Sequence, residues 1–124
     1  MKLFLLLSGL TLLTLSASDC NNKKPSEKYK GKLEIAGICM NYTIRLTEGT
    51  IDTAKICASW TDEVTNKSYS NVFRLGSPCD FPSTIKQGDE FYFVIDTAKP
   101  KECVVCMAYY PTPPRSLNIK VVEK

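Results

Sequence analysis

Residues 33–48 read LEIAGICMNYTIRLTE, and this stretch decides the fold. Its apolar side chains recur at every second position, which is the period of a β-strand with one buried face. The alternation starts at Leu33, reverses its parity at Gly37 and continues to Leu46. A parity switch at a glycine is typical of a strand that bends or bulges while its apolar residues stay on one face. The stretch therefore predicts one long strand that is bent at Gly37 and ends at Glu48.

Five further stretches have strand character and are separated by polar, Gly-containing or Pro-containing loops. Residues 90–96 are so dense in apolar side chains that we expect a central strand buried on both faces. No amphipathic helix, repeat or second domain is visible. The pattern predicts an all-β fold of about six strands, either a small antiparallel β-sandwich or a partly open OB-like barrel. The five stretches are 56–60, 69–75, 90–96, 103–110 and 117–121.

The N-terminus has the features of a secretory signal peptide. Lys2 precedes an uncharged apolar run at residues 3–15, and small residues follow at 16–18. A membrane span needs roughly 20 apolar residues, so this run is too short for a permanent anchor helix. We therefore expect residues 1–18 to direct export and to be removed.

Cys20 opens a polar tail directly after the export signal. The apolar run, the cysteine and the sequence Asn21-Asn22-Lys23-Lys24-Pro25 together resemble the N-termini of small exported lipoproteins of Bacteroidota. The resemblance covers only this region and implies an acyl anchor on the Cys20 thiol. It departs from the pattern at Asp19, where a lipobox has Gly, Ala or Ser. Simple secretion and lipidation at Cys20 both remain open.

The positive charge of the chain lies in the tail. The net charge is +3, yet residues 21–32 alone carry five Lys and one Glu, while residues 33–124 carry ten basic and eleven acidic side chains. We therefore divide the mature chain into a Lys-rich tether at 19–32 and one β-domain at 33–124. A neutral domain lacks the basic face that nucleic acids require. We expect contact with a membrane only through the signal peptide or a lipid anchor at Cys20.

Six cysteines in a short exported chain indicate disulfides, because the compartment is oxidising. We predict two bridges among Cys39, Cys79, Cys103 and Cys106, and we take Cys57 as the odd thiol. Cys103 and Cys106 have the C-x-x-C spacing of thiol–disulfide oxidoreductases. In a strand, however, positions three apart point to opposite faces. The two sulfurs are then expected to bond separate partners, with Cys39 and Cys79 as the natural ones.

The sequence lacks the residues that the common catalytic and cofactor-binding sites require. The chain has no histidine, which removes the commonest general base and two ligands of a blue-copper site. Cysteines in an oxidising compartment favour bridges over a zinc site. We predict no enzymatic activity, no cofactor and no metal.

Aromatic side chains are the remaining candidates for ligand contact. They lie near the ends of predicted strands, where exposed rings stack on sugars or anchor protein interfaces. We expect a non-enzymatic binding or adhesion module at or outside the cell surface, with a protein or glycan ligand. One alternative is a small secreted inhibitor or effector acting through the loop at 111–114, and another is a redox protein using Cys103 and Cys106. The aromatic candidates are Trp60, Tyr69, Tyr109 and Tyr110.

Overall fold

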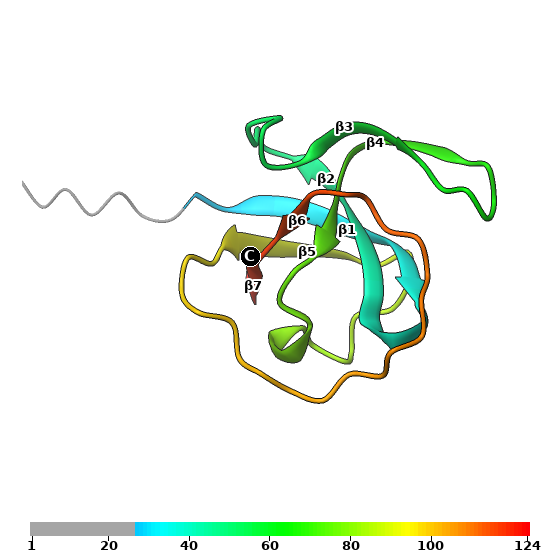
Figure 1. Ribbon diagram of the computed structural model, residues 1–124. Helices are drawn as coiled ribbons and strands as arrows, with labels where there is room; N and C mark the ends of the chain where they lie inside the picture. Colours follow the sequence, from blue (N-terminus) through cyan, green and yellow to red (C-terminus); the bar gives the residue numbers. More distant parts are fainter. Residues whose placement is uncertain (1–26) are drawn as a thin grey trace, which may run out of the picture.

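The computed structural model describes residues 27–124, which contain seven strands (Figure 1). The predicted signal peptide 1–18 and the predicted lipidation site Cys20 lie outside these residues. No helix that is long and apolar enough to cross a bilayer occurs between residues 27 and 124. The strands are β1 (Tyr29–Gly37), β2 (Asn41–Glu48), β3 (Cys57–Thr61), β4 (Ser68–Leu75), β5 (Glu90–Ile95), β6 (Ser116–Leu117) and β7 (Ile119–Val122).

All seven strands belong to one sheet, which the C-terminal stretch curls into a partly open barrel. The sheet has the order β3-β4-β2-β1-β5-β7, with antiparallel neighbours. β6 lies off this path and pairs in parallel with β4. Only Asn118 separates β6 from β7, so the same stretch of chain hydrogen-bonds to β4 and to β5. The predicted all-β class is confirmed, and the single curled sheet matches the OB-like alternative.

The predicted long, bent strand at 33–48 is wrong, because the chain reverses there. β1 and β2 form an antiparallel hairpin joined by a 3-10 turn, Ile38–Met40. Cys39 and Met40 have φ values of 59° and 61°, in the left-handed region that L-residues seldom adopt. The Asn41 side chain stabilises the turn by donating to the Ile38 carbonyl at 2.7 Å. The reversal of apolar parity therefore marks a chain reversal rather than a bend within one strand. The turn itself, Ile38–Met40, contains no Gly, Pro, Asn or Asp.

The β-domain begins earlier than the predicted boundary at residue 33. β1 starts at Tyr29, which is buried and stacks on Phe93 with ring centroids 5.5 Å apart. Lys30 and Lys32 alternate with the buried Tyr29 and Gly31. The lysines that suggested a tether to residue 32 are thus the outward positions of an amphipathic strand.

Aromatic rings form the centre of the barrel interior. Phe93 on β5 is fully buried and contacts Phe73 and Phe91 at centroid distances of 5.8 and 6.0 Å. The prediction that this strand is central is confirmed, since β5 lies between β1 and β7. The expected burial on both faces is wrong, because Tyr92 and Val94 on its second face are only half-buried. The remaining core residues are aliphatic or aromatic and come from five of the other strands and from the loops before β3 and β5: Tyr29, Leu33, Ile44, Leu46, Ile51, Ile56, Leu75, Phe81, Leu117 and Ile119.

Two of the predicted strands, 56–60 and 69–75, are confirmed as β3 and β4, which form an antiparallel hairpin that extends beyond the barrel in Figure 1. A tight turn precedes β5, with Gly88 at a φ of 95°. The predicted strand at 103–110 is wrong. These residues form no strand, and the strand that pairs with β5 on the side away from β1 is β7.

A second buried layer lies on the outer side of the sheet. Ile35 pairs with Thr43, and Val72 pairs with both Arg45 and Cys57. Thr43 and Arg45 alternate with core residues of β2, so this set faces away from the barrel interior. Ile35, Thr43, Cys57 and Val72 are nevertheless buried, and Thr43 Oγ1 has no hydrogen-bond partner.

We expect Thr43→Val to raise the free energy of unfolding by about 1 kcal/mol. The substitution keeps the β-branched shape and removes a buried hydroxyl that lacks a partner. Urea unfolding followed by tryptophan fluorescence measures the change.

Thr47→Val on the same strand is the matched control, since Thr47 Oγ1 donates to the Lys30 carbonyl at 3.0 Å. Its free energy of unfolding should fall by about 1 kcal/mol. A loss of stability in Thr43→Val would show that its hydroxyl is bonded in solution.

Candidate functional site

A long segment without secondary structure connects β5 to β6. We call residues 97–115 the strap; in Figure 1 it runs, in orange, round the outside of the barrel. Connections of this length without strands or helices are uncommon in compact domains and are often functional. The strap is therefore the first place to look for a site.

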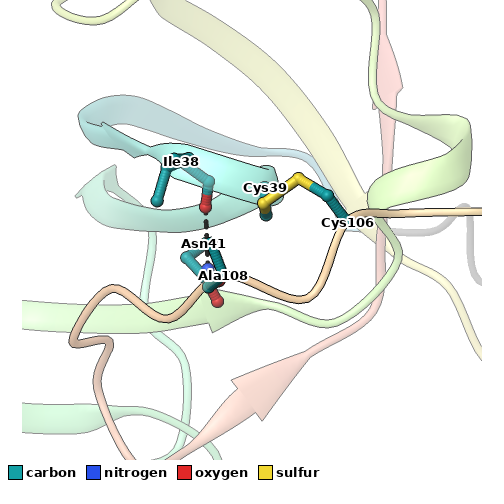
Figure 2. Close-up of a disulfide and its surroundings, with 5 residues drawn as sticks. All are labelled: Ile38, Cys39, Asn41, Cys106 and Ala108. Carbon is teal, nitrogen blue, oxygen red and sulfur yellow. Dashed lines mark hydrogen bonds between the residues drawn. A yellow bond between two sulfur atoms is a disulfide. The ribbon is translucent and has the colours of Figure 1, made fainter.

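The main chain of the strap is almost free of hydrogen bonds. Within the described part of the chain, residues 97–114 make no backbone–backbone hydrogen bond. Two side chains bond to the main chain of this stretch. Asp96 accepts from the Ala98 N–H at 2.9 Å. Asn41 donates to the Ala108 carbonyl, also at 2.9 Å, as Figure 2 shows. Most of its N–H and C=O groups are therefore available to water or to a partner.

Two disulfides hold the strap to the barrel in place of hydrogen bonds. Cys103 bonds Cys79 in the 3-10 turn Pro78–Asp80, and Cys106 bonds Cys39 in the turn between β1 and β2 (Figure 2). The predicted disulfide stapling is confirmed. Cys103 and Cys106 bond separate partners, although no strand is present to direct them apart. Cys57 is buried and unpaired among the described residues.

The residues between and after these anchors present apolar side chains to solvent. Val104 is 101% exposed, Met107 94% and Tyr109 78%, while Ile38 beside the bridged Cys39 is 59% exposed. Single exposed apolar residues are ordinary, but these four lie within three positions of Cys39 or Cys106 along the chain, and we refer to them together as the patch. We call residues 103–109 the clamped segment.

An apolar pocket of about 460 Å³ opens beside the clamped segment. The turn after β1, the start of β2 and the loop before β5 supply its walls, and Tyr42 meets Phe81 edge to face at 5.7 Å inside it. Residues 103–105 complete the lining. The surface near Val104 is therefore concave as well as apolar, which suits an inserted side chain.

The C-terminal part of the strap is buried instead. Pro111 and Pro113 are buried, so the loop at 111–114 does not present the contact surface that the inhibitor alternative assigned to it. Tyr110 lies against Gly37, where a Cβ would be 3.1 Å from its ring, and its hydroxyl donates to Asp62 Oδ2 at 3.0 Å. This part of the strap covers the outer side of the sheet.

Asp62 fastens the strap to the β3–β4 hairpin. The residue is fully buried, and its carboxylate also accepts from the Val64 N–H at 2.9 Å and the Thr65 hydroxyl at 3.1 Å. Burial acts to raise the pKa of Asp62, but the hydrogen bonds from Val64, Tyr110 and Thr65 outweigh it. The pKa therefore lies below the ordinary 3.8. The bond to Asp62 is the main reason that the pKa of Tyr110 is raised.

The four aromatic candidates divide into two groups. Trp60 and Tyr69 stack on each other with centroids 6.1 Å apart, and Lys67 Nζ lies 5.2 Å from the Tyr69 ring. Tyr110 is occupied by Asp62. Tyr109 is the exposed member, with its hydroxyl 3.4 Å from Glu63 Oε1. The structure brings only Tyr109 into the patch of the clamped segment.

Sequence reasoning missed Ile38, Val104 and Met107 as contact residues. Dense apolar residues usually indicate a buried strand, so the sequence pattern predicts burial for these side chains. The flanking cysteines are the signal that could have found them, because a segment fixed by disulfides at both ends does not need strand pairing to hold it in place.

Within residues 27–124, no three His, Cys, Asp or Glu side chains converge as metal ligands. Comparison with known proteins gives no lead, since no family model, curated protein or solved structure matches this chain. The clamped segment, the exposed Ile38 and the adjoining pocket are therefore the candidate site.

We expect loss of the Cys39–Cys106 bridge to cost more stability than loss of the Cys79–Cys103 bridge. The bridged residues are 67 and 24 positions apart, and closing a longer loop restricts the unfolded chain more. The free energy of unfolding should fall by about 4 kcal/mol in Cys39→Ala/Cys106→Ala and about 3 kcal/mol in Cys79→Ala/Cys103→Ala. Chemical denaturation of both pairs checks the order, and the reverse order contradicts it.

We expect Asp62→Asn to flatten the acid dependence of stability. Because the folded-state pKa is lowered, the carboxylate stabilises the fold above pH 3.8, and this contribution is lost as the pH falls through the folded-state value. At pH 7 the variant should be less stable than wild type, and the gap should close on acidification.

Thermal unfolding between pH 7 and pH 2 measures that gap. Tyr110→Phe is the matched control, since it removes one donor and leaves the carboxylate with the others. Its pH dependence should lie between those of wild type and Asp62→Asn. Parallel curves for wild type and Asp62→Asn contradict the assignment.

Proposed function

We propose that this chain is an exported, non-enzymatic binding module that contacts a partner protein through the clamped segment and Ile38. The observation that carries the proposal is the exposure of Val104 and Met107 on a segment that is fixed at two points. A soluble domain gains nothing in its own stability from apolar side chains held in water. Burial of these side chains against a partner would contribute favourably to the free energy of binding.

Rigid presentation strengthens this argument. Association costs free energy when a loop must be ordered, and a segment that is already fixed loses less on binding. The bridges at Cys103 and Cys106 fix the main chain around Val104 without using its hydrogen-bonding groups. The segment therefore offers main-chain donors and acceptors together with apolar side chains, which is how extended segments bind proteins.

The other candidate functions have less support. A sugar site usually gathers several open aromatic faces, whereas Trp60 and Tyr69 stack on each other and Tyr109 is the one exposed ring among the four candidates. A redox role would need Cys103 and Cys106 as a mutual pair, but each is bonded elsewhere. The inhibitor alternative remains compatible with the clamped segment, although not with the buried prolines.

The proposed place of action is outside the cytoplasm. Two disulfides are typical of an oxidising compartment. We further propose that residues 1–18 are a cleaved signal peptide and that the mature chain is either released or anchored through an acyl group on Cys20. The intact mass of the natively produced protein separates the two forms.

Site-directed photo-crosslinking tests the binding proposal. A photoreactive amino acid at Val104 should give a covalent adduct with one extracellular protein in the native culture, identified by mass spectrometry. The same group at Val64, which is 64% exposed on the β3–β4 hairpin, should give none.

Competition completes the experiment. Excess wild-type protein should abolish the adduct, whereas Val104→Asp/Met107→Asp should compete at least about tenfold less well, because an apolar contact does not accept carboxylates. Val64→Asp should compete like wild type. Equal competition by all three proteins excludes the clamped segment as the binding surface.

A further inference from the structure

The peptide between Cys103 and Cys106 is anchored to the barrel at both of its ends. Cys103 bonds Cys79 in the Pro78–Asp80 turn, whereas Cys106 bonds Cys39 in the turn of the β1–β2 hairpin. Only Val104 and Val105 lie between the two anchors. A break of the main chain here would leave each new end attached to the domain by its own disulfide.

This peptide also has the features by which endopeptidases recognise substrates. Such enzymes bind an extended chain through main-chain hydrogen bonds and place its side chains in pockets. The main chain of the clamped segment is unpaired, and Val104 projects entirely into solvent. No basic or acidic side chain interrupts residues 103–109.

We propose that the clamped segment is a substrate-like inhibitory loop for an extracellular endopeptidase whose primary pocket accepts an aliphatic side chain, with Val104 as the residue in that pocket. This inference rests on the proposed function and names the partner class for the same surface. The alternative of a partner without peptidase activity is an outcome of the test below.

The bridges explain why such a loop would inhibit rather than be consumed. Hydrolysis adds one water across the Val104–Val105 amide and leaves a carboxylate on Val104 and an amine on Val105. In an ordinary substrate the two products diffuse apart. Here the disulfides hold both ends close together, so their effective concentration stays high and the amide can re-form on the enzyme. The cut loop would leave the active site slowly.

Inhibition of an elastase-type serine endopeptidase is the direct test, because its primary pocket is small and apolar. The disulfide-intact protein should inhibit near one-to-one stoichiometry. Val104→Asp should raise the inhibition constant at least about 100-fold, because the pocket cannot solvate a carboxylate. Val64→Asp should inhibit like wild type. Both substituted side chains are exposed, and matching unfolding curves exclude misfolding as the cause.

A change of specificity provides the second arm. Trypsin requires a basic side chain in its primary pocket, so wild type should not inhibit it through this loop, whereas Val104→Lys should. After long incubation, the non-reduced inhibitor should gain the mass of one water, and reduction should separate fragments ending at residue 104 and beginning at residue 105.

The outcomes separate the two proposals. Rapid hydrolysis without inhibition, or failure of Val104→Lys to inhibit trypsin, overturns the inhibitory loop. If a photoreactive group at Val104 then still captures one partner that lacks peptidase activity, the binding proposal stands alone. If neither inhibition nor a position-specific adduct is found, both proposals fail.

Discussion

Closure of the sheet by its last few residues is the constraint on which the rest of the molecule depends. β6 must pair with β4 and β7 with β5, although only Asn118 separates them. Ser77 reinforces the junction, because its hydroxyl donates to the Ile119 carbonyl and accepts from the Ile119 N–H, both at 3.0 Å. The chain leaving β5 must therefore travel round the outside of the barrel before it can return. The strap is the consequence of that route.

A segment on such a route does not gain stability from strand pairing, and the domain uses four other attachments instead. The two disulfides fix its middle, the Asn41 side chain holds the Ala108 carbonyl, and the buried Asp62 holds Tyr110. The same attachments cover the outer side of the hairpin strands. The two parts of the strap thus differ. Residues 101–109 are exposed to solvent, whereas Pro111 and Pro113 are buried against the rest of the domain.

Local pattern predicted the parts of the fold that depend on local rules. Alternation identified the strands β3 and β4, and apolar density identified the central β5. Local pattern failed at the Ile38–Met40 turn, where Cys39 and Met40 hold left-handed backbone that favours Gly or Asn. It failed again at 103–110, because a run of exposed apolar residues has the same sequence pattern as a buried strand. The bridging cysteines were predicted correctly. The candidate site depends on which apolar side chains are exposed, and the sequence pattern does not specify exposure.

The two bridges are nested, since the loop closed by Cys79 and Cys103 lies wholly inside the one closed by Cys39 and Cys106. Shorter loops close at a smaller entropic cost. The inner bridge is therefore favoured to oxidise first, and once formed it shortens the path that Cys39 and Cys106 must close. Burial of Cys57 on β3 withdraws the remaining described thiol from exchange as the barrel forms. Between the two bridges of the folded domain, the spacing of the cysteines along the chain thus favours closure of the inner one before the outer one.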